Sequence, residues 1–171
     1  MNDSMHAPIL TFPLPVLLVV AMPGGKAIYQ QWIQENVDVL VDEVLSQIAG
    51  DSSLRHYRIR LKPDEVRQRI RAVIQDGFER LQTWLLSDKQ DDEVLRPYIE
   101  LGRERRREGA PLEEVVRVFL MVNRTINAQI ESNKLFNRRY RLNELADLNR
   151  DTATFFSKIV HAIIMGYEEG V

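Results

Sequence analysis

The stretch from Leu101 to Ile130, LGRERRREGAPLEEVVRVFLMVNRTINAQI, constrains the fold of this chain more than any other. A charged run ends at Gly109, and glycine tolerates the left-handed conformation that closes a helix. Pro111 suits a first helical position, where its missing N–H would have no partner. Glu113 and Glu114 then place negative charge beside the positive end of the helix dipole. The sequence therefore predicts a helix that ends at Gly109 and another that begins at Pro111.

The helix that begins at Pro111 is the most apolar in the chain. Val118 and Met121 lie off the centre of its apolar face, so its first half is apolar on almost every side, and such helices are usually buried among others. We therefore expect a core helix, with a subunit interface as the alternative. The face itself follows helical spacing and comprises Leu112, Val115, Val116, Phe119, Leu120, Val122, Ile126 and Ile130.

Apolar residues at helical spacing predict four more helices, so the chain reads as an all-α, globin-like helical bundle of about five main helices. Residues 54–62 alternate loosely, but one strand without a partner is implausible, so we interpret them as a connector. Gly77 is expected to permit a close helix–helix approach, and Pro97 to bend its helix or mark its first turn. The five helices are predicted at about 26–49, 63–86, 91–108, 111–135 and 142–169.

Residues 1–25 form an apolar extension before a single domain of residues 26–171. The apolar run Ile9–Met22 contains two prolines and is too short for a membrane span, and no basic region of a signal peptide precedes it. Three interpretations remain open: an extension from an upstream start codon, a strap packed on the helices, and an arm that contacts a partner or a membrane. We favour the strap.

Composition excludes several kinds of chemistry. There are no cysteines, which removes disulfides and thiol catalysis and fits a reducing cytoplasm. His6, His56 and His161 are well separated, and none lies on an apolar helix face that would suit a metal or a haem. His161 falls beside Thr154, Lys158 and Met165 instead, which indicates solvent or an interface. We expect no cofactor, no metal and no catalytic residue.

Three arginine-rich segments, Arg55–Arg71, Arg103–Arg107 and Arg138–Arg141, could form a surface for phosphate or nucleic acid. Acidic residues interleave the first two, the net charge is −2, and no nucleic-acid recognition motif accompanies them. We therefore interpret them as solvated helix faces paired with nearby acids, and we expect no nucleic-acid partner.

The aromatic residues favour a core. Trp32 and Trp84 lie on or beside apolar helix faces, and Phe155 and Phe156 lie on the apolar face of the last helix. The two phenylalanines could also line a pocket for a small molecule. A small-molecule-binding helical protein is therefore the alternative to a signalling function.

The pattern from Leu101 to Val115 resembles the N-terminal domain of RsbR-type stressosome proteins, the RsbT co-antagonist RsbRD N-terminal domain family. The upstream tryptophan-containing helix and the aromatic last helix agree with that family in order and length. The resemblance spans residues 26–169, and its matching residues are Leu101, Gly102, Arg105, Gly109, Pro111, Leu112, Glu113, Glu114 and Val115.

The resemblance implies a globin-like sensor or signalling domain without haem, cytoplasmic and usually dimeric. It assigns no catalytic residue. It implies a homodimer, which we place at the last two helices, and a signalling protein as partner. In the family the domain often precedes an output module, so a sequence that ends at Val171 fits a stand-alone member or a domain cut at its edge. Within the matched residues, we expect Arg105 to pair with Glu113 or Glu114 across the turn.

If residues 1–25 pack on the domain as a strap, deleting residues 1–22 should lower the melting temperature, because apolar surface would lose its cover. Thermal unfolding of the full and shortened chains, followed by circular dichroism, measures this. An unchanged melting temperature would exclude the strap.

Overall fold

The computed structural model describes residues 25–86, 91–132 and 142–169, and every regular element in this part of the chain is helical. The predicted all-α bundle is therefore confirmed, and the predicted helix limits agree with the observed ones to within one to three residues where the chain is described. The extension before residue 25, the loop 87–90 and the basic segment 133–141 lie outside the described residues. The elements are α1 (Gly25–Gly50), η1 (His56–Arg60), α2 (Pro63–Leu86), α3 (Asp91–Arg107), α4 (Leu112–Ser132) and α6 (Leu142–Glu169).

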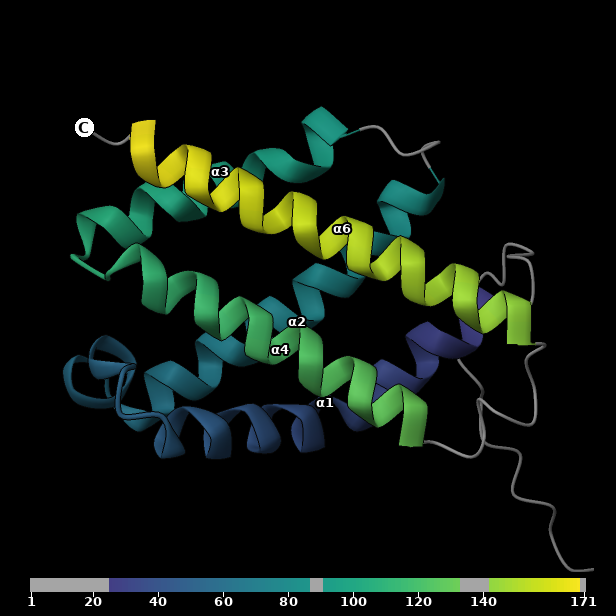
Figure 1. Cartoon of the computed structure of the whole chain (residues 1–171), viewed down its shortest axis with the longest axis horizontal. Coiled ribbons are helices and arrows are strands. Elements are labelled where there is room, and N and C mark those ends of the chain that lie inside the picture. Colours follow the sequence, from purple (N-terminus) through teal and green to yellow (C-terminus); the bar gives the residue numbers. More distant parts are fainter. Residues whose placement is uncertain (1–24, 87–90, 133–141, 170–171) are drawn as a thin grey trace, which may run out of the picture.

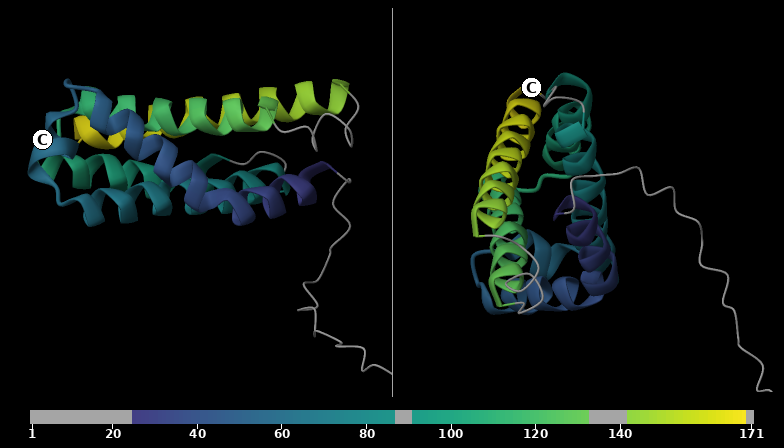
Figure 2. Two further views of the ribbon diagram at one scale, coloured as in Figure 1. Left: turned by 90° about the horizontal axis from the view of Figure 1, so that it is seen from below. Right: turned by 90° about the vertical axis from the view of Figure 1, so that its right-hand side faces the viewer.

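The helices form two layers. Figure 2 shows α4 and α6 in one layer and α2 and α3 in the other, while α1 crosses from one layer to the other along an edge. The helix α1 packs on both α2 and α4, and α3 packs on α6 more extensively than any other pair (Figure 1). The core between the layers contains the predicted aromatic residues, with Trp84 and Phe155 almost fully buried and Trp32 and Phe156 also buried.

The helices α3 and α6 run side by side in the same direction, and two glycines set their spacing. A Cβ built on Gly102 would lie 2.8 Å from the backbone nitrogen of Tyr167, and one built on Gly166 would lie 2.6 Å from the carbonyl carbon of Ile99. Distances this short leave no room for any side chain at either position. The two backbones are therefore in direct contact.

The close approach was predicted at the wrong glycine. A Cβ on Gly77 would meet only the hydroxyl of Tyr98, at 3.9 Å, which is ordinary van der Waals contact. The periodicity of α2 shows that Gly77 faces inward, but what lies opposite it is a side chain and not another backbone. Pro97 lies inside α3, six residues after the helix begins, so it does not mark the first turn.

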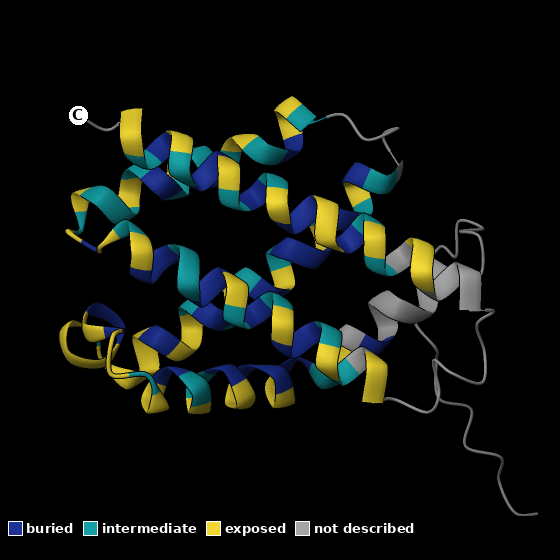
Figure 3. Cartoon of the chain, in the orientation of Figure 1, coloured by how far each residue is buried: buried dark blue, intermediate teal, exposed yellow. Residues whose placement is uncertain are grey.

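The connector predicted at residues 54–62 contains a short π-helix, η1, of which His56 and Tyr57 are buried. The apolar face predicted for α4 is also shifted. Val118 is buried, whereas Leu120 is 43% exposed, because α1 and α6 cover the side of α4 that carries Val115, Phe119, Val122 and Ile126. Figure 3 shows the buried residues of the bundle turned inward and the exposed ones along its outer sides.

Replacing Gly102 or Gly166 by alanine should lower the free energy of unfolding by about 1–3 kcal/mol, because the new methyl group must push α3 and α6 apart. Urea denaturation measures the change. Gly50→Ala is the matched control, since nothing lies within 4 Å of a Cβ at that helix end. A loss from Gly102→Ala no larger than the loss from Gly50→Ala would contradict the close approach.

Candidate functional site

The turn between α3 and α4 is closed as its sequence predicts. Gly109 has a φ of 73°, and it is the one glycine with a positive φ among the described residues. Its N–H donates to the carbonyl of Arg106 at 2.9 Å, and the N–H of Ala110 donates to the carbonyl of Arg105 at 3.0 Å. This pair of bonds is the Schellman arrangement that ends a helix at glycine.

The start of α4 lies one residue later than predicted. The helix begins at Leu112, and the carbonyl of Pro111 accepts its first bond from the N–H of Val115 at 3.1 Å. Glu113 and Glu114 lie in the first turn, as the sequence indicated. The residue between the two helices, Ala110, is fully buried, and its carbonyl accepts a hydrogen bond from the Tyr167 hydroxyl of α6 at 2.8 Å.

Glu108 is the centre of a charged network beneath this turn. The guanidinium of Arg69, from α2, donates to both oxygens of Glu108 at 2.7 and 3.1 Å. Arg105 donates to the same carboxylate at 2.6 Å, and only 13% of the Arg105 side chain is exposed. Two-point guanidinium–carboxylate contacts are among the stronger and more directional polar contacts in proteins. The network therefore ties the end of α3 to α2.

The predicted partner of Arg105 was wrong, because both candidate carboxylates have other partners. Glu113 points outward to Arg117 at 3.0 Å. Glu114 points inward, and its carboxylate accepts the backbone N–H of His56 at 2.8 Å. Glu108 lies one turn after Arg105 on the same side of the chain, so the shorter reach decides the pairing.

Glu114 anchors η1 to α4. Only 8% of Glu114 is exposed, so its hydrogen bond to His56 forms in a nearly dry environment, where such a bond is strong and costly to lose. The His56 side chain is also buried, and both of its ring nitrogens lack a hydrogen-bond partner among the described residues. Burial lowers the pKa of His56, while the nearby carboxylates of Glu114 and Glu108 oppose that shift.

His56 is the main residue that sequence reasoning undervalued. A histidine in a nine-residue connector carries no periodic signal of burial, and only the fold brings η1 against α1 and the start of α4. Its neighbour Tyr57 is buried too. Burial raises the pKa of the Tyr57 hydroxyl, and the positive charges of Arg105 and Arg69 act against the rise.

The residues that carried the family resemblance divide between two contacts. Leu101 packs against the core, and Gly102 faces α6. Arg105, Gly109 and the buried Glu114 belong to the turn and its network. Of the remaining four, Pro111, Leu112 and Glu113 lie at the start of α4 and are at least partly exposed, whereas Val115 is fully buried.

The arginine-rich segments are paired in part, as predicted. From the first segment, Arg67 pairs with Asp42 at 2.7 Å and Arg71 pairs with Asp38. From the second, Arg103 pairs with Glu100 and Glu169. The beginning of the first segment differs, since Arg55, Arg58, Arg60 and Lys62 are exposed and none of them forms an ion pair within the described residues.

A groove of about 640 Å³ runs between α3 and α6. His161 lies in its wall beside Thr154, Lys158 and Met165, as the helical wheel predicted, and it is exposed. Phe155 and Phe156 do not line this groove. No cluster of three or more histidine, cysteine, aspartate or glutamate side chains in the described part of the chain could hold a metal ion. No helix among the described residues is long and apolar enough to cross a membrane.

The match to a protein family includes this turn and covers most of the chain. The sequence from residue 34 to residue 170 matches the family described as the RsbT co-antagonist protein rsbRD N-terminal domain. The chain belongs to this family. It is a family of signalling domains of the stressosome type. The match over residues 34–170 extends the resemblance at Leu101–Val115 to almost the whole described domain. Neither a curated protein nor a solved structure matches the chain.

Glu108→Gln should lower the free energy of unfolding at pH 7 by about 1–3 kcal/mol, because the partly buried guanidinium groups of Arg69 and Arg105 lose their counter-charge. Although burial opposes it, hydrogen bonds from Arg69 and Arg105 lower the pKa of Glu108. The carboxylate therefore stabilises the fold above the unfolded-state pKa, about 4.3, and this stabilisation is lost as the pH falls through the lowered pKa.

Urea denaturation between neutral and acidic pH measures this dependence, and the difference between the two proteins should shrink as the pH drops below about 4. Glu131→Gln is the matched control, since Glu131 is an exposed glutamate of α4. A deficit that stays constant with pH would show that Glu108 acts by packing and not by charge.

Proposed function

We propose that this chain is a non-enzymatic, globin-like sensor domain that works in the cytoplasm without haem. In this proposal it self-associates through the outward face of α4 and α6 and relays the binding of a ligand or a partner protein. Membership of a signalling family over residues 34–170 is the observation that carries the proposal. The outer surface of the α4–α6 layer supports the choice of interface.

The outward side of α6 is poor in charge. Between Asp151 and Glu168 it carries one formal charge, Lys158, and its exposed residues include Ala153, Thr154, Ser157, His161 and Met165. The adjacent α4 adds the exposed Leu120, with Val116 and Met121 half-buried beside it and the charged side chains of Glu113, Arg117 and Arg124 around them. Depletion of charged residues with an exposed methionine, as on this side of α6, is typical of the centre of a protein–protein interface.

The outward side of α1 has the opposite character. It exposes Asp38, Asp42 and Glu43 within two turns, and two of these carboxylates pair with arginines of α2. A face with this density of carboxylates would repel a second copy of itself across a two-fold axis. This contrast between the two sides of the bundle favours α4 and α6 as the place where two copies meet.

The turn between α3 and α4 provides a physical route for a relay. Gly102 fixes α3 against α6, and Glu108 and Glu114 fix the following turn to α2 and η1. A change at η1 therefore reaches both helices of the proposed interface through backbone contacts and buried hydrogen bonds. In this proposal, a signal would move the two helices that the turn joins, α3 and α4.

A small-molecule-binding function is the second candidate, and the groove between α3 and α6 favours it. Its volume of about 640 Å³ lies within the usual range for ligand sites, and Leu95, Ile99 and Met165 provide apolar surface. Asp91, paired with Lys158 at one end, provides polar contacts. Native mass spectrometry of the purified protein, which detects a co-purified ligand, distinguishes this function from one that depends on a protein partner alone.

Leu120→Glu and Met165→Glu should each weaken the dimer by about tenfold or more, because a carboxylate would be buried without a partner. Sedimentation velocity over a range of protein concentrations measures the dissociation constant. Val39→Glu is the control, since Val39 is an exposed apolar residue on α1, at 54% against 43% for Leu120 and 39% for Met165. A native chain that is monomeric at micromolar concentration, or a control as disruptive as the two test variants, would refute this interface.

A further inference from the structure

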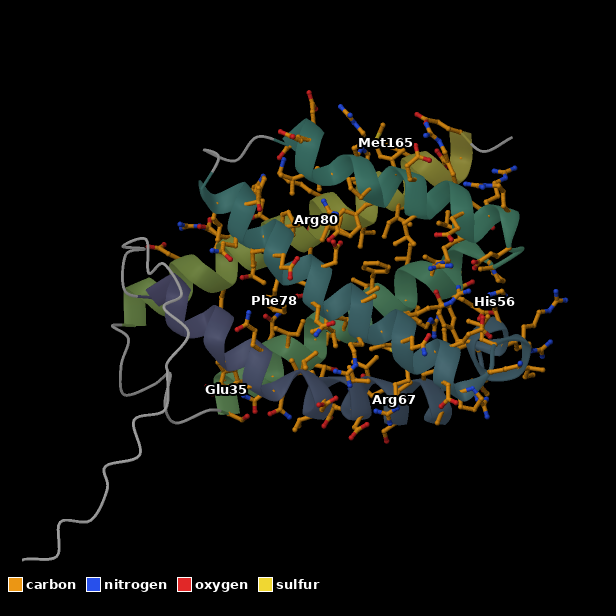
Figure 4. All side chains as sticks on the ribbon, turned by 180° about the vertical axis from the view of Figure 1, so that it is seen from behind. Glu35, His56, Arg67, Phe78, Arg80 and Met165 are labelled. Carbon is orange, nitrogen blue, oxygen red and sulfur yellow. The ribbon has the colours of Figure 1, made fainter. Side chains whose placement is uncertain are left out.

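The corner formed by the end of α1, η1 and the start of α2 has features that neither the network nor the α4–α6 face uses. A groove of about 470 Å³ lies there. Its floor is apolar and comes from Leu45 and Ile48 of α1, Leu61 after η1 and Val66 of α2. Figure 4 labels Arg67 on α2 and His56 in η1 near the two sides of this corner.

Positive charge is concentrated on the η1 side of the groove, where Arg58 is one of the lining residues. Between Leu54 and Pro63 the chain contains Arg55, Arg58, Arg60 and Lys62 and no acidic residue. All four are exposed, and none forms an ion pair within the described residues. On the α2 side the wall is mixed, since Arg67 is paired with Asp42 and Asp64 contributes a carboxylate.

An exposed isoleucine lies among these cations. Ile59 is 76% exposed, the largest value among the exposed large hydrophobic residues described. An aliphatic side chain at the outer surface of a cationic helix, beside an apolar groove, suits a partner that offers both carboxylates and apolar side chains. The π-helical turn is what holds Ile59 outward while its neighbours His56 and Tyr57 face inward.

We propose that this groove binds an acidic segment of a partner protein that carries apolar side chains at intervals along it. The apolar groups would occupy the floor at Leu61 and Val66, and the carboxylates would meet Arg58 and Arg60. This chemistry is a charge-complementary form of the binding of an amphipathic segment in a groove.

Two other macromolecules fit the corner less well. A nucleic-acid backbone would satisfy the cations, but it would leave the apolar floor of Leu45, Ile48 and Leu61 without a partner. An anionic membrane is a flat surface, and a concave floor would not reach it, so only Ile59 would insert. A peptide segment uses both the charge and the concavity.

The groove is also connected to the turn between α3 and α4. Tyr57 lines the groove, and the charges of Arg69 and Arg105 in the Glu108 network act on the pKa of its hydroxyl. Next to it, the backbone of His56 is held by Glu114 of α4. An occupant that shifts η1 would therefore act directly on the buried network. The groove is distinct from the α4–α6 face, so peptide binding and self-association can each be absent without the other.

Fluorescence anisotropy of the full chain tests the proposal with three labelled synthetic peptides of equal length: alternating glutamate and leucine, glutamate and serine, and lysine and leucine. The glutamate–leucine peptide should bind at least about tenfold more tightly than the glutamate–serine peptide, because the leucines enter the apolar floor. The lysine–leucine peptide should not bind. Equal affinity for both acidic peptides, or binding of the lysine–leucine peptide, would overturn the proposal.

Variants locate the binding. The double variant Arg58→Glu and Arg60→Glu should lower the affinity by about tenfold or more, and Arg96→Glu on α3 is the matched control, which should bind as the native chain does. Leu61→Gln should abolish the higher affinity for the glutamate–leucine peptide than for the glutamate–serine peptide. If this variant does not fold, the comparison of peptides on the native chain and the arginine variants still test the proposal. Retained affinity in the double variant, or binding to phosphatidylserine vesicles with none to any peptide, would refute the site.

Discussion

The contact of two helix backbones at Gly102 and Gly166 determines the position of every other functional element. Because neither position has a side chain, α3 lies directly against α6 along most of its length. The end of α3 is then held beside the end of α6, where the Tyr167 hydroxyl and the carbonyl of Ala110 join them. These contacts fix the direction of the turn between α3 and α4, so α4 lies in the same layer as α6.

The polar network beneath that turn has a different physical character. Close packing of backbones is short-ranged and does not depend on pH, whereas the contacts of Glu108 and Glu114 depend on charge and on the exclusion of water. Glu108 gathers guanidinium groups from two helices, and Glu114 holds a backbone N–H of η1. One side of the turn is thus fixed by packing and the other by charge, and the charged side is the one that a partner could alter.

The distribution of charge over the bundle gives each surface a different use. The outward side of α6 between Asp151 and Glu168 is nearly uncharged, the α1 face is acidic with internal ion pairs, and the η1 corner is basic without them. For a domain of a signalling family, this arrangement suits two separate associations, one with a second copy and one with an acidic partner segment. The buried hydrogen bond from η1 to α4 and the partly buried ion pair from α2 to Glu108 lie between these two surfaces and would couple them.

Local physical chemistry was enough to predict the helices from the sequence. Helical spacing and capping residues depend on neighbours along the chain, so they predicted the limits of the five main helices, the glycine stop at Gly109 and the buried aromatic residues such as Trp84 and Phe155. The resemblance at Leu101–Val115 led to the family for the same reason. The residues that cap this turn are close neighbours along the chain.

Contacts between distant segments were decided by the tertiary structure alone. The periodicity of α4 could not show that Val118 would be covered and Leu120 exposed, since that depends on where α1 and α6 lie. The sequence pattern also could not choose Gly102 over Gly77 as the point of backbone contact. The burial of His56 belongs to the same class. Each of these outcomes depends on which residues of distant segments lie opposite one another. The local sequence pattern does not predict those contacts.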